Sequence, residues 1–285
     1  MTTRGVITRV LSVAGSDSGG GAGIQADLKA FARCGVHGMT AVTAVTAQNT
    51  RGVISIHGVP PEVIVAQIEA VVRDIGVDAV KVGMLGSRAA VVAVAGAVDK
   101  LAAQRVPIVV DPVLVASTGT RLLGVDGLDA LRELLLPLAT VLTPNLPEAR
   151  TLVESAGRRS TDAAEELDDA GLARALGSMG PAYVVLTGGH RVVASDLYWD
   201  GETVVEIPGE RHPGGSAHGS GCTHSAVLAA ELGRGRSVLE AARIARALTA
   251  DAVGRGLGEL GGGDGPVDVL GLTGPTDPGR ADRLP

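Results

Sequence analysis

The sequence predicts an α/β protein in which parallel strands are covered by helices on both faces. Apolar runs of strand length alternate along the 285 residues with amphipathic segments of helix length, which is typical of this class. Hydrophobic residues make up 45% of the chain but aromatic residues only 1%. The core must therefore be built from Val, Leu, Ile and Ala, the mixture that buried parallel strands prefer. The 41 glycines indicate backbone that approaches a ligand closely.

Six short apolar runs are expected to form the main strands. In order they are 8–14, 38–46, 78–83, 107–111, 140–143 and 182–187. Pro107 and Pro181 stand at the starts of two of them, where a missing N–H is tolerated. Segments 192–199 and 203–207, joined by an Asp-Gly turn, have the pattern of an antiparallel hairpin at the sheet edge.

Eight amphipathic segments are expected to be helices. In order they are 22–34, 61–75, 87–104, 126–136, 146–154, 162–179, 221–233 and 237–256. The glycine-rich stretches 256–265 and 273–285 are expected to be loop and loose tail. Because no repeat and no linker composition interrupts the pattern, residues 1–270 are expected to form a single domain, followed by a C-terminal tail over 271–285.

Composition argues against several classes of function. The formal net charge is −6 and no stretch gathers basic residues into a stripe, so nucleic acid is not an expected partner. No apolar segment reaches membrane-spanning length, and the N-terminus lacks a signal-peptide pattern. Cys34 and Cys222 are the only cysteines, too few for a disulfide framework. The expectation is a cytoplasmic enzyme with no membrane partner.

A glycine-rich loop over 14–23 follows the first expected strand and opens the first expected helix. Residues 21–26 fit the G-x-G-x-x-G/A form of dinucleotide-binding proteins, but the next strand ends at Thr46 without the acidic residue that would hold a ribose. A nicotinamide site is therefore a distant alternative, and no lysine is placed for a P-loop. The loop suits a flat ligand. Asp27 would either hydrogen-bond that ligand or stabilise the helix N-terminus.

The motif His-Gly-Ser-Gly-Cys-Thr over 218–223 precedes an apolar helix. Its glycines allow successive N–H groups to point the same way, and the helix dipole adds positive potential, which suits a transferring phosphoryl group. The pKa of Cys222 is expected to fall at a helix N-terminus. It could then accept a proton or hydrogen bond from a substrate hydroxyl. The alternative is an ordinary glycine-rich helix start with a buried, inert cysteine, and with His218 and His224 as surface or capping residues.

Polar residues follow three of the central strands. Asp111 ends a strand at the edge where open α/β sheets bind ligands. Asn145 and Glu148 lie three apart at the next strand exit, where oxygen ligands would suit Mg²⁺ bridging to phosphate. A helix cap is the alternative for this pair. Thr187 begins the loop after the next strand, which could line a nucleotide pocket.

These motifs occur together in one order, and in that combination the chain resembles the hydroxymethylpyrimidine/phosphomethylpyrimidine kinases of thiamin biosynthesis, a branch of the ribokinase-like superfamily. The motifs are AGSDSGGGAGIQADLK (14–29), AQNTRGV (47–53), KVGML (81–85), DPV (111–113), TPNLPEA (143–149), GGH (188–190) and HGSGCT (218–223). The resemblance runs from about residue 9 to 270. It implies a three-layer α/β/α fold with a mostly parallel central sheet, a homodimer, and ATP and Mg²⁺ acting on a small pyrimidine.

The resemblance also implies roles for individual residues. Those expected around the pyrimidine are Gln48 at its amino edge, Met84 beside the ring, and Asp27, Gly15 and Ala22. Those expected at the reacting hydroxymethyl group and the anion hole are Cys222, Gly219, Ser220 and Gly221. Those expected to bind ATP are Asn145, Thr187, Gly188 and His218, and those expected to support the metal are Glu148 and Asp111.

Two lysines of this family are absent. The family usually has a lysine before Gly-Gly-His, where this chain has Thr187, and often another a few residues before the last motif, within 213–217. No lysine follows Lys100. Phosphoryl transfer relies on positive charge at the phosphates, so Arg121 and Arg211 are candidates to supply it.

Other functions stay open. A pyridoxal or pyridoxine kinase would also act on a flat nitrogen heterocycle that bears a CH₂OH group, but the Gln48 amide can pair with an aminopyrimidine as donor and acceptor together. A non-catalytic pyrimidine-binding protein would explain the missing lysines. Neither the second phosphorylation, of the monophosphate, nor the preferred nucleotide follows from the sequence.

Overall fold

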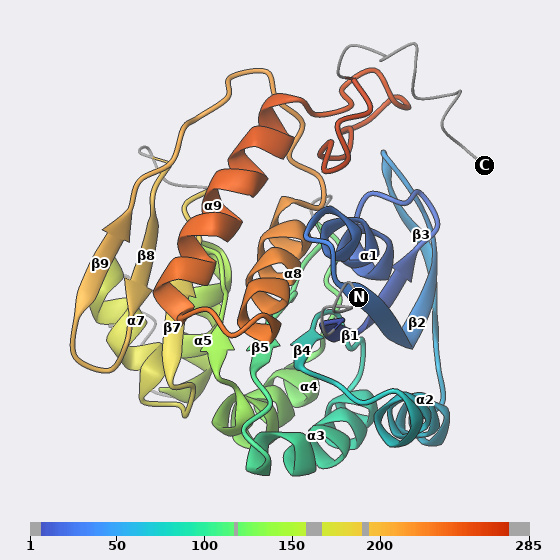
Figure 1. Ribbon diagram of the computed structural model, residues 1–285, viewed down its shortest axis with the longest axis vertical. Helices are drawn as coiled ribbons and strands as arrows, with labels where there is room; N and C mark the ends of the chain where they lie inside the picture. Colours follow the sequence, from blue (N-terminus) through green and yellow to red (C-terminus); the bar gives the residue numbers. More distant parts are fainter. Residues whose placement is uncertain (1–6, 117–118, 158–166, 190–193, 274–285) are drawn as a thin grey trace, which may run out of the picture.

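The computed structural model describes residues 7–116, 119–157, 167–189 and 194–273, and within them it contains a nine-stranded sheet (Figure 1). Across the sheet the strands are β3 (Gly52–Gly58), β2 (His37–Asn49), β1 (Arg9–Asp17), β4 (Ala79–Val82), β5 (Ile108–Val110), β6 (Val141–Leu142), β7 (Tyr183–Leu186), β8 (Asp196–Trp199) and β9 (Val204–Ile207). Neighbours from β2 to β7 are parallel. Strands β3, β8 and β9 pair antiparallel at the two edges.

The six predicted central strands and the edge hairpin are confirmed, but the other edge differs. β2 continues to Asn49 and pairs with β3, a strand that was not predicted from the sequence. The reason is that β3 lacks the alternation of a half-buried strand: most of its side chains are exposed, and Ile54 is 76% exposed. Residues 192–193 of the predicted hairpin lie outside the described residues.

Helices cover both faces of the sheet (Figure 1). Those on one face are α1 (Gly23–Arg33), α8 (Ser220–Gly233) and α9 (Val238–Gly254). Those on the other are α2 (Pro61–Asp74), α3 (Arg88–Ala103), α4 (Val125–Ala130), α5 (Leu146–Ala156) and α7 (Asp169–Gly177). Within the described ranges, none of the helices is long and apolar enough to cross a membrane.

Two predicted helices differ in detail. The segment 126–136 forms α4, a π-helical turn η1 (Leu131–Leu135) and a 3₁₀ turn η2 (Leu136–Leu138). Pro137 has no N–H to donate, so regular α-helical bonding cannot continue there. In the predicted helix 162–179, α7 is present, while residues 162–166 lie outside the described part of the chain, as do residues 274–285 of the predicted tail.

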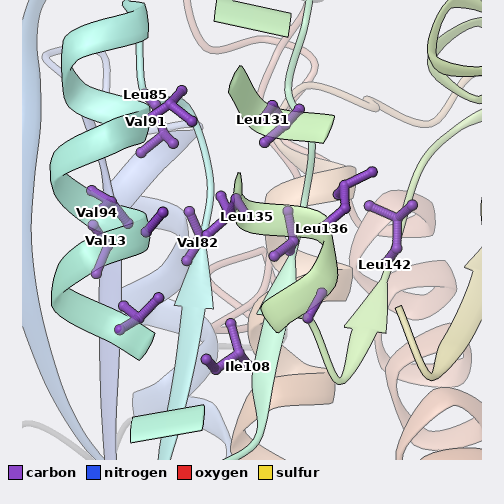
Figure 2. Close-up of a cluster of buried hydrophobic side chains, with 14 of the residues drawn as sticks. Val13, Val82, Leu85, Val91, Val94, Ile108, Leu131, Leu135, Leu136 and Leu142 are labelled. Carbon is purple, nitrogen blue, oxygen red and sulfur yellow. The ribbon is translucent and has the colours of Figure 1, made fainter. Parts of the chain in front are cut away.

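Strand side chains alternate between two apolar cores. In β1, Leu11 and Val13 pack on the side of α2 and α3, whereas Val10 packs on the side of α1 and α8. Figure 2 shows Val91 and Val94 of α3 in the same buried cluster as Val13 of β1 and Val82 of β4. Both faces of the central strands are buried, as period-two alternation between two helix layers requires. The predicted three-layer α/β/α arrangement is confirmed.

The parallel strands bring the predicted motifs to one edge of the sheet. The glycine-rich loop follows β1, Met84 follows β4, and Asp111 follows β5. Asn145 follows β6 and Thr187 follows β7. Because the carboxyl ends of parallel strands share an edge, these residues face one region of the molecule.

Candidate active site

Asp17 organises the glycine-rich loop after β1. Its carboxylate accepts hydrogen bonds from the backbone N–H groups of Gly19 (2.8 Å), Gly21 (2.9 Å) and Ala22 (2.8 Å). Burial raises the pKa of the Asp17 carboxyl, but hydrogen bonds from His218 and from this backbone outweigh it, so its pKa lies below the ordinary value. Of the backbone near Ala22, which is expected to complete the pyrimidine pocket, the Ala22 N–H is therefore bound to Asp17.

A small apolar surface lies beside this loop. A Cβ atom at Gly15 would be 3.3 Å from the Met84 sulfur, so the Met84 side chain would have to shift slightly to admit one. Met84, which is 9% exposed, packs with Ala44 and Leu122. The edges of these side chains can hold one face of a flat ring, which fits the positions that the resemblance assigns to Gly15 and Met84.

Gln48 lies near the end of β2, next to the same loop. The Ser18 hydroxyl donates to the Gln48 carbonyl (2.7 Å) and accepts from its N–H (2.8 Å). The side-chain Oε1 atom accepts from the Thr46 hydroxyl at 3.2 Å. Among the described residues the Nε2 group donates to no protein acceptor, so this amide edge is available to a ligand.

A buried ion pair lies between α1 and β4. Lys81 Nζ is 3.0 Å from both carboxylate oxygens of Asp27, and the Ser12 hydroxyl donates to Asp27 at 2.5 Å. Both charged side chains are 0% exposed. Burial raises the pKa of Asp27; burial lowers the pKa of Lys81, but the Asp27 carboxylate more than offsets this, so the pKa of Lys81 is raised. The partner of Asp27 is thus Lys81 rather than the helix N-terminus.

Lys81 was not among the functional residues predicted from the sequence. The available signal was a lysine in the middle of β4, whose four residues are all buried. A buried lysine requires a counter-charge. That counter-charge lies in a helix 54 positions away, so sequence alone did not identify it.

The 218–223 motif forms the start of α8. Gly219 has φ +79° and caps the helix, and the Ser220 N–H donates to the Ala217 carbonyl at 3.0 Å. In the described chain the N–H groups of Gly221 and Cys222 have no acceptor, as is usual in the first turn of a helix. These two N–H groups therefore form the available part of the expected anion hole, while that of Ser220 is already bound.

Gly219→Ala is expected to lower the free energy of unfolding by about 1–3 kcal/mol. A Cβ at this position would lie 1.8 Å from the Gly21 carbonyl oxygen, and φ is in the left-handed region. The matched control is Gly221→Ala, where nothing lies within 4 Å of the added atom. Urea unfolding of both variants tests this, and equal losses would contradict the close contact between the two loops.

The Cys222 thiol lies between α1 and the central strands. It accepts a hydrogen bond from the Gly23 N–H, and Lys81, Asp27 and Asp111 act on it electrostatically. Burial raises the pKa of the thiol to about 12, with Lys81 opposing and the two carboxylates adding to the rise. The expectation of a lowered pKa is therefore wrong. Although part of the residue reaches solvent, desolvation of the sulfur outweighs the helix N-terminus.

Two buried carboxylates follow β5 and β6. Asp111 accepts from the Ser225 hydroxyl (2.9 Å), and Glu148 accepts from the N–H groups of Asn145 (3.0 Å) and Leu114 (3.3 Å). Burial and the nearby Asp111 raise the pKa of Glu148 to about 7. Asn145 and Glu148 form a reciprocal capping box at α5, so the helix-cap alternative is what the structure shows.

The donor set of these two carboxylates fits Mg²⁺. No group of three or more His, Cys, Asp or Glu side chains in the described ranges could enclose a metal ion. Mg²⁺ commonly binds through one or two carboxylates and keeps water and phosphate oxygens as its other ligands. Since Asp111 disfavours ionisation of Glu148, a cation between them would relieve their repulsion.

The loop after β7 is bound to its neighbours through its backbone. The Thr187 N–H donates to the Pro144 carbonyl (2.9 Å), and the Gly188 N–H donates to Asp196 (2.8 Å). Arg121 and Arg211, the candidate replacements for the missing lysines, are both exposed. Which of them reaches phosphate stays a prediction, and residue 190 of the GGH motif lies outside the described residues.

Both histidines of the last motif region are buried, contrary to the surface or capping alternative. His218 Nε2 is 3.3 Å from Asp17 Oδ2, and His224 Nε2 is 2.9 Å from Asp196 Oδ2. The side chain of His218 is therefore directed at the glycine-rich loop rather than left free for ATP.

Two surface hollows of about 370 and 610 Å³ lie elsewhere. The first is lined by the end of α1 and by residues 255 and 270–271, and the second by α3 and the start of α2. Neither is lined by a predicted site residue, so the candidate site is defined by the converging motifs.

Comparisons with known proteins agree with these motifs. A family described as phosphomethylpyrimidine kinase matches residues 17–268. A hydroxymethylpyrimidine/phosphomethylpyrimidine kinase of Mycobacterium tuberculosis is 46% identical over 265 residues, covering 92% of this chain and 94% of that one. The pyridoxal kinase of Staphylococcus aureus in complex with AMP-PCP and pyridoxal has a TM-score of 0.80 at 33% identity, covering 94% and 96%. The phosphomethylpyrimidine kinase of Clostridium difficile 630 has a TM-score of 0.68 at 33% identity, covering 84% and 96%.

Proposed function

This chain belongs to the phosphomethylpyrimidine kinase family, and from that premise we propose that it phosphorylates 4-amino-5-hydroxymethyl-2-methylpyrimidine and its monophosphate with ATP, in thiamin biosynthesis. The fold is ribokinase-like, as predicted. The observation that carries the proposal is the position of Cys222. Its thiol adjoins Gly23, which packs against the Gly15 carbonyl of the ring surface, and it lies at the helix start that offers two N–H groups.

In this proposal each wall of the site has one task. Met84 and Gly15 support the ring, and the Gln48 amide binds its amino edge. The N–H groups of Gly221 and Cys222 stabilise charge on the transferring phosphoryl group. Cys222 takes the hydroxyl proton when it is a thiolate. Lys81 and the Gly23 N–H favour this form, although burial and the carboxylates of Asp111 and Asp27 outweigh them and raise the pKa of the thiol to about 12. Asp27 acts indirectly, by holding Lys81 in place.

We assign Mg²⁺ to Asp111 and Glu148 and the nucleotide to the loops of Asn145 and Thr187–Gly188. The ion would supply positive charge to the β- and γ-phosphate oxygens. Solved relatives with bound AMP-PCP support ATP as the phosphoryl donor. Each Glu148 oxygen accepts one backbone N–H, and because a carboxylate oxygen can accept more than one partner, Glu148 could keep α5 capped while it holds the ion.

Pyridoxal phosphorylation is a second candidate activity, favoured by the pyridoxal kinases among the solved relatives. A coupled ADP-release assay with Mg²⁺-ATP, hydroxymethylpyrimidine and pyridoxal separates the two. Turnover that depends on the pyrimidine supports the proposed function. Turnover with pyridoxal alone would assign the second activity. Binding of the pyrimidine without turnover would identify a non-catalytic descendant.

Gln48→Ala is expected to raise KM for the pyrimidine about tenfold and to leave KM for ATP within about twofold, because it removes hydrogen bonds to the ring only. Asn49→Ala is the matched control. It truncates the neighbouring amide, whose oxygen accepts from the Arg51 N–H in an exposed turn. Steady-state kinetics with each substrate varied measures both constants. Equal rises in the two KM values would remove Gln48 from the pyrimidine pocket.

Three further properties are part of this proposal. The continuous nine-stranded sheet supports one kinase domain over 1–270. The resemblance, together with the exposed apolar side chains of Val45, Ile54 and Ile56 on β2 and β3, supports a homodimer. The free thiol required at Cys222 supports the reducing cytoplasm as its location.

A further inference from the structure

Two histidines bracket the anion hole, and each is bound to a different loop of the site. His218 precedes Gly219, and His224 follows Thr223 in the first turns of α8. They are 7% and 3% exposed. Each faces a carboxylate that is far away in the sequence: the partner of His218 is Asp17, and the partner of His224 is Asp196.

The pair on the substrate side joins α8 to the glycine-rich loop. Asp17 holds three backbone N–H groups of that loop and lies 3.3 Å from His218 Nε2. A Cβ atom at Gly21 would be 2.4 Å from the His218 ring. The imidazole therefore packs directly on the loop, and a change in its position moves the loop or leaves Asp17 without its side-chain partner.

The pair on the nucleotide side joins α8 to the loop after β7. Asp196 Oδ1 accepts the Gly188 N–H at 2.8 Å, and Oδ2 lies 2.9 Å from His224 Nε2. A Cβ atom at Gly188 would be 1.9 Å from the Ser195 carbonyl oxygen, so the loop is tightly packed as well. Arg246 of α9 adds a positive group, with Nε 3.9 Å from Asp196 Oδ1.

Both ring nitrogens that face the carboxylates must carry a proton, because a carboxylate can only accept. A buried carboxylate that loses such a donor keeps its desolvation penalty, so these contacts strongly restrict where the carboxylate can lie. Each aspartate in turn restricts the backbone it binds.

We propose that the Asp17–His218 and Asp196–His224 pairs are positioning devices, which fix the anion hole relative to the pyrimidine loop and to the nucleotide loop respectively. The inference rests on the proposed function. Phosphoryl transfer requires donor and acceptor oxygens in line, and small misplacements of either reduce the rate. Because the two contacts are separate, the start of α8 can set the distance from the anion hole to the pyrimidine loop and its distance to the nucleotide loop.

The test is a comparison of substrate-specific effects. His224→Leu is expected to raise KM for Mg²⁺-ATP about tenfold and to leave KM for the pyrimidine within about twofold. His218→Leu is expected to do the reverse. His→Gln at each position should recover most of the affinity, because the glutamine amide can donate to the same carboxylate. The control is His37→Leu, an exposed histidine at the opposite, amino end of β2.

Equal rises in both KM values for each variant, or folded variants with unchanged KM values, would overturn the inference. Asp196→Asn keeps the side-chain shape and serves if His224→Leu does not fold. Calorimetry with AMP-PCP and with the pyrimidine provides a second readout. Wild-type protein that binds both but turns over neither pyrimidine nor pyridoxal would defeat the proposed function alone. The positioning inference would be contradicted if, in calorimetry, each histidine variant weakened binding of AMP-PCP and of the pyrimidine equally.

Discussion

Replacing Cys222 by serine is expected to lower kcat for pyrimidine phosphorylation about 10²- to 10³-fold, with much smaller changes in both KM values. The serine hydroxyl can still accept the Gly23 N–H bond, so the pocket should keep its shape. A hydroxyl ionises far less readily than a thiol, however, and the site already disfavours a negative charge there: the pKa of the thiol itself is raised to about 12. Proton acceptance should therefore suffer more than binding.

The matched control for Cys222→Ser is Cys34→Ser. Cys34 is the other free thiol, buried at the end of α1 in the core beneath α8. Its replacement should leave kcat and both KM values close to those of the wild-type protein, although stability falls. Steady-state kinetics of both variants is the measurement. An unchanged kcat for Cys222→Ser would make this cysteine structural and shift proton acceptance to another group.

Lys81→Met is expected to reduce the free energy of unfolding by about 3–5 kcal/mol. The variant leaves Asp27 without its cation, at a position where both side chains are 0% exposed. The Ser12 hydroxyl remains as a hydrogen-bond donor but brings no charge. Urea unfolding followed by circular dichroism measures the change.

The control for Lys81→Met is Arg73→Met, which breaks an exposed i,i+4 ion pair with Glu69. Exposed pairs contribute at most about 1 kcal/mol, so this variant should remain close to the wild type. The double variant Lys81→Met/Asp27→Leu should recover much of the loss, because it removes both buried charges together. A loss below about 1 kcal/mol for Lys81→Met alone would contradict the buried ion pair.

Much of the fold follows from local patterns. The central strands and most helix boundaries agree with the sequence because each depends on apolar periodicity and on turn residues within a short window. β3 was missed because it is an exposed edge strand. Most of its side chains are exposed, so its sequence lacks the alternation of apolar and polar residues that predicts a strand. The π-helical turn at Leu131–Leu135 depends on how the chain packs before Pro137, which periodicity does not describe.

The candidate site, like the fold, was predicted in part from the sequence. The order of its motifs identified the family, and parallel strands necessarily bring the ends of β1, β4, β5, β6 and β7 to one edge. The state of the Cys222 thiol was predicted wrongly, because a helix N-terminus can be recognised in sequence whereas the burial that raises the pKa is a property of the packed molecule.

By itself, then, the sequence determined the fold class, the family and the chemical groups available at the sheet edge. Only the tertiary structure decided which of those groups meet. Lys81 reaches Asp27 across 54 positions, and His218 reaches Asp17 across 201. Such pairs are made by the packing of α1 and α8 on one face of the sheet, and no local pattern in either partner specifies the other.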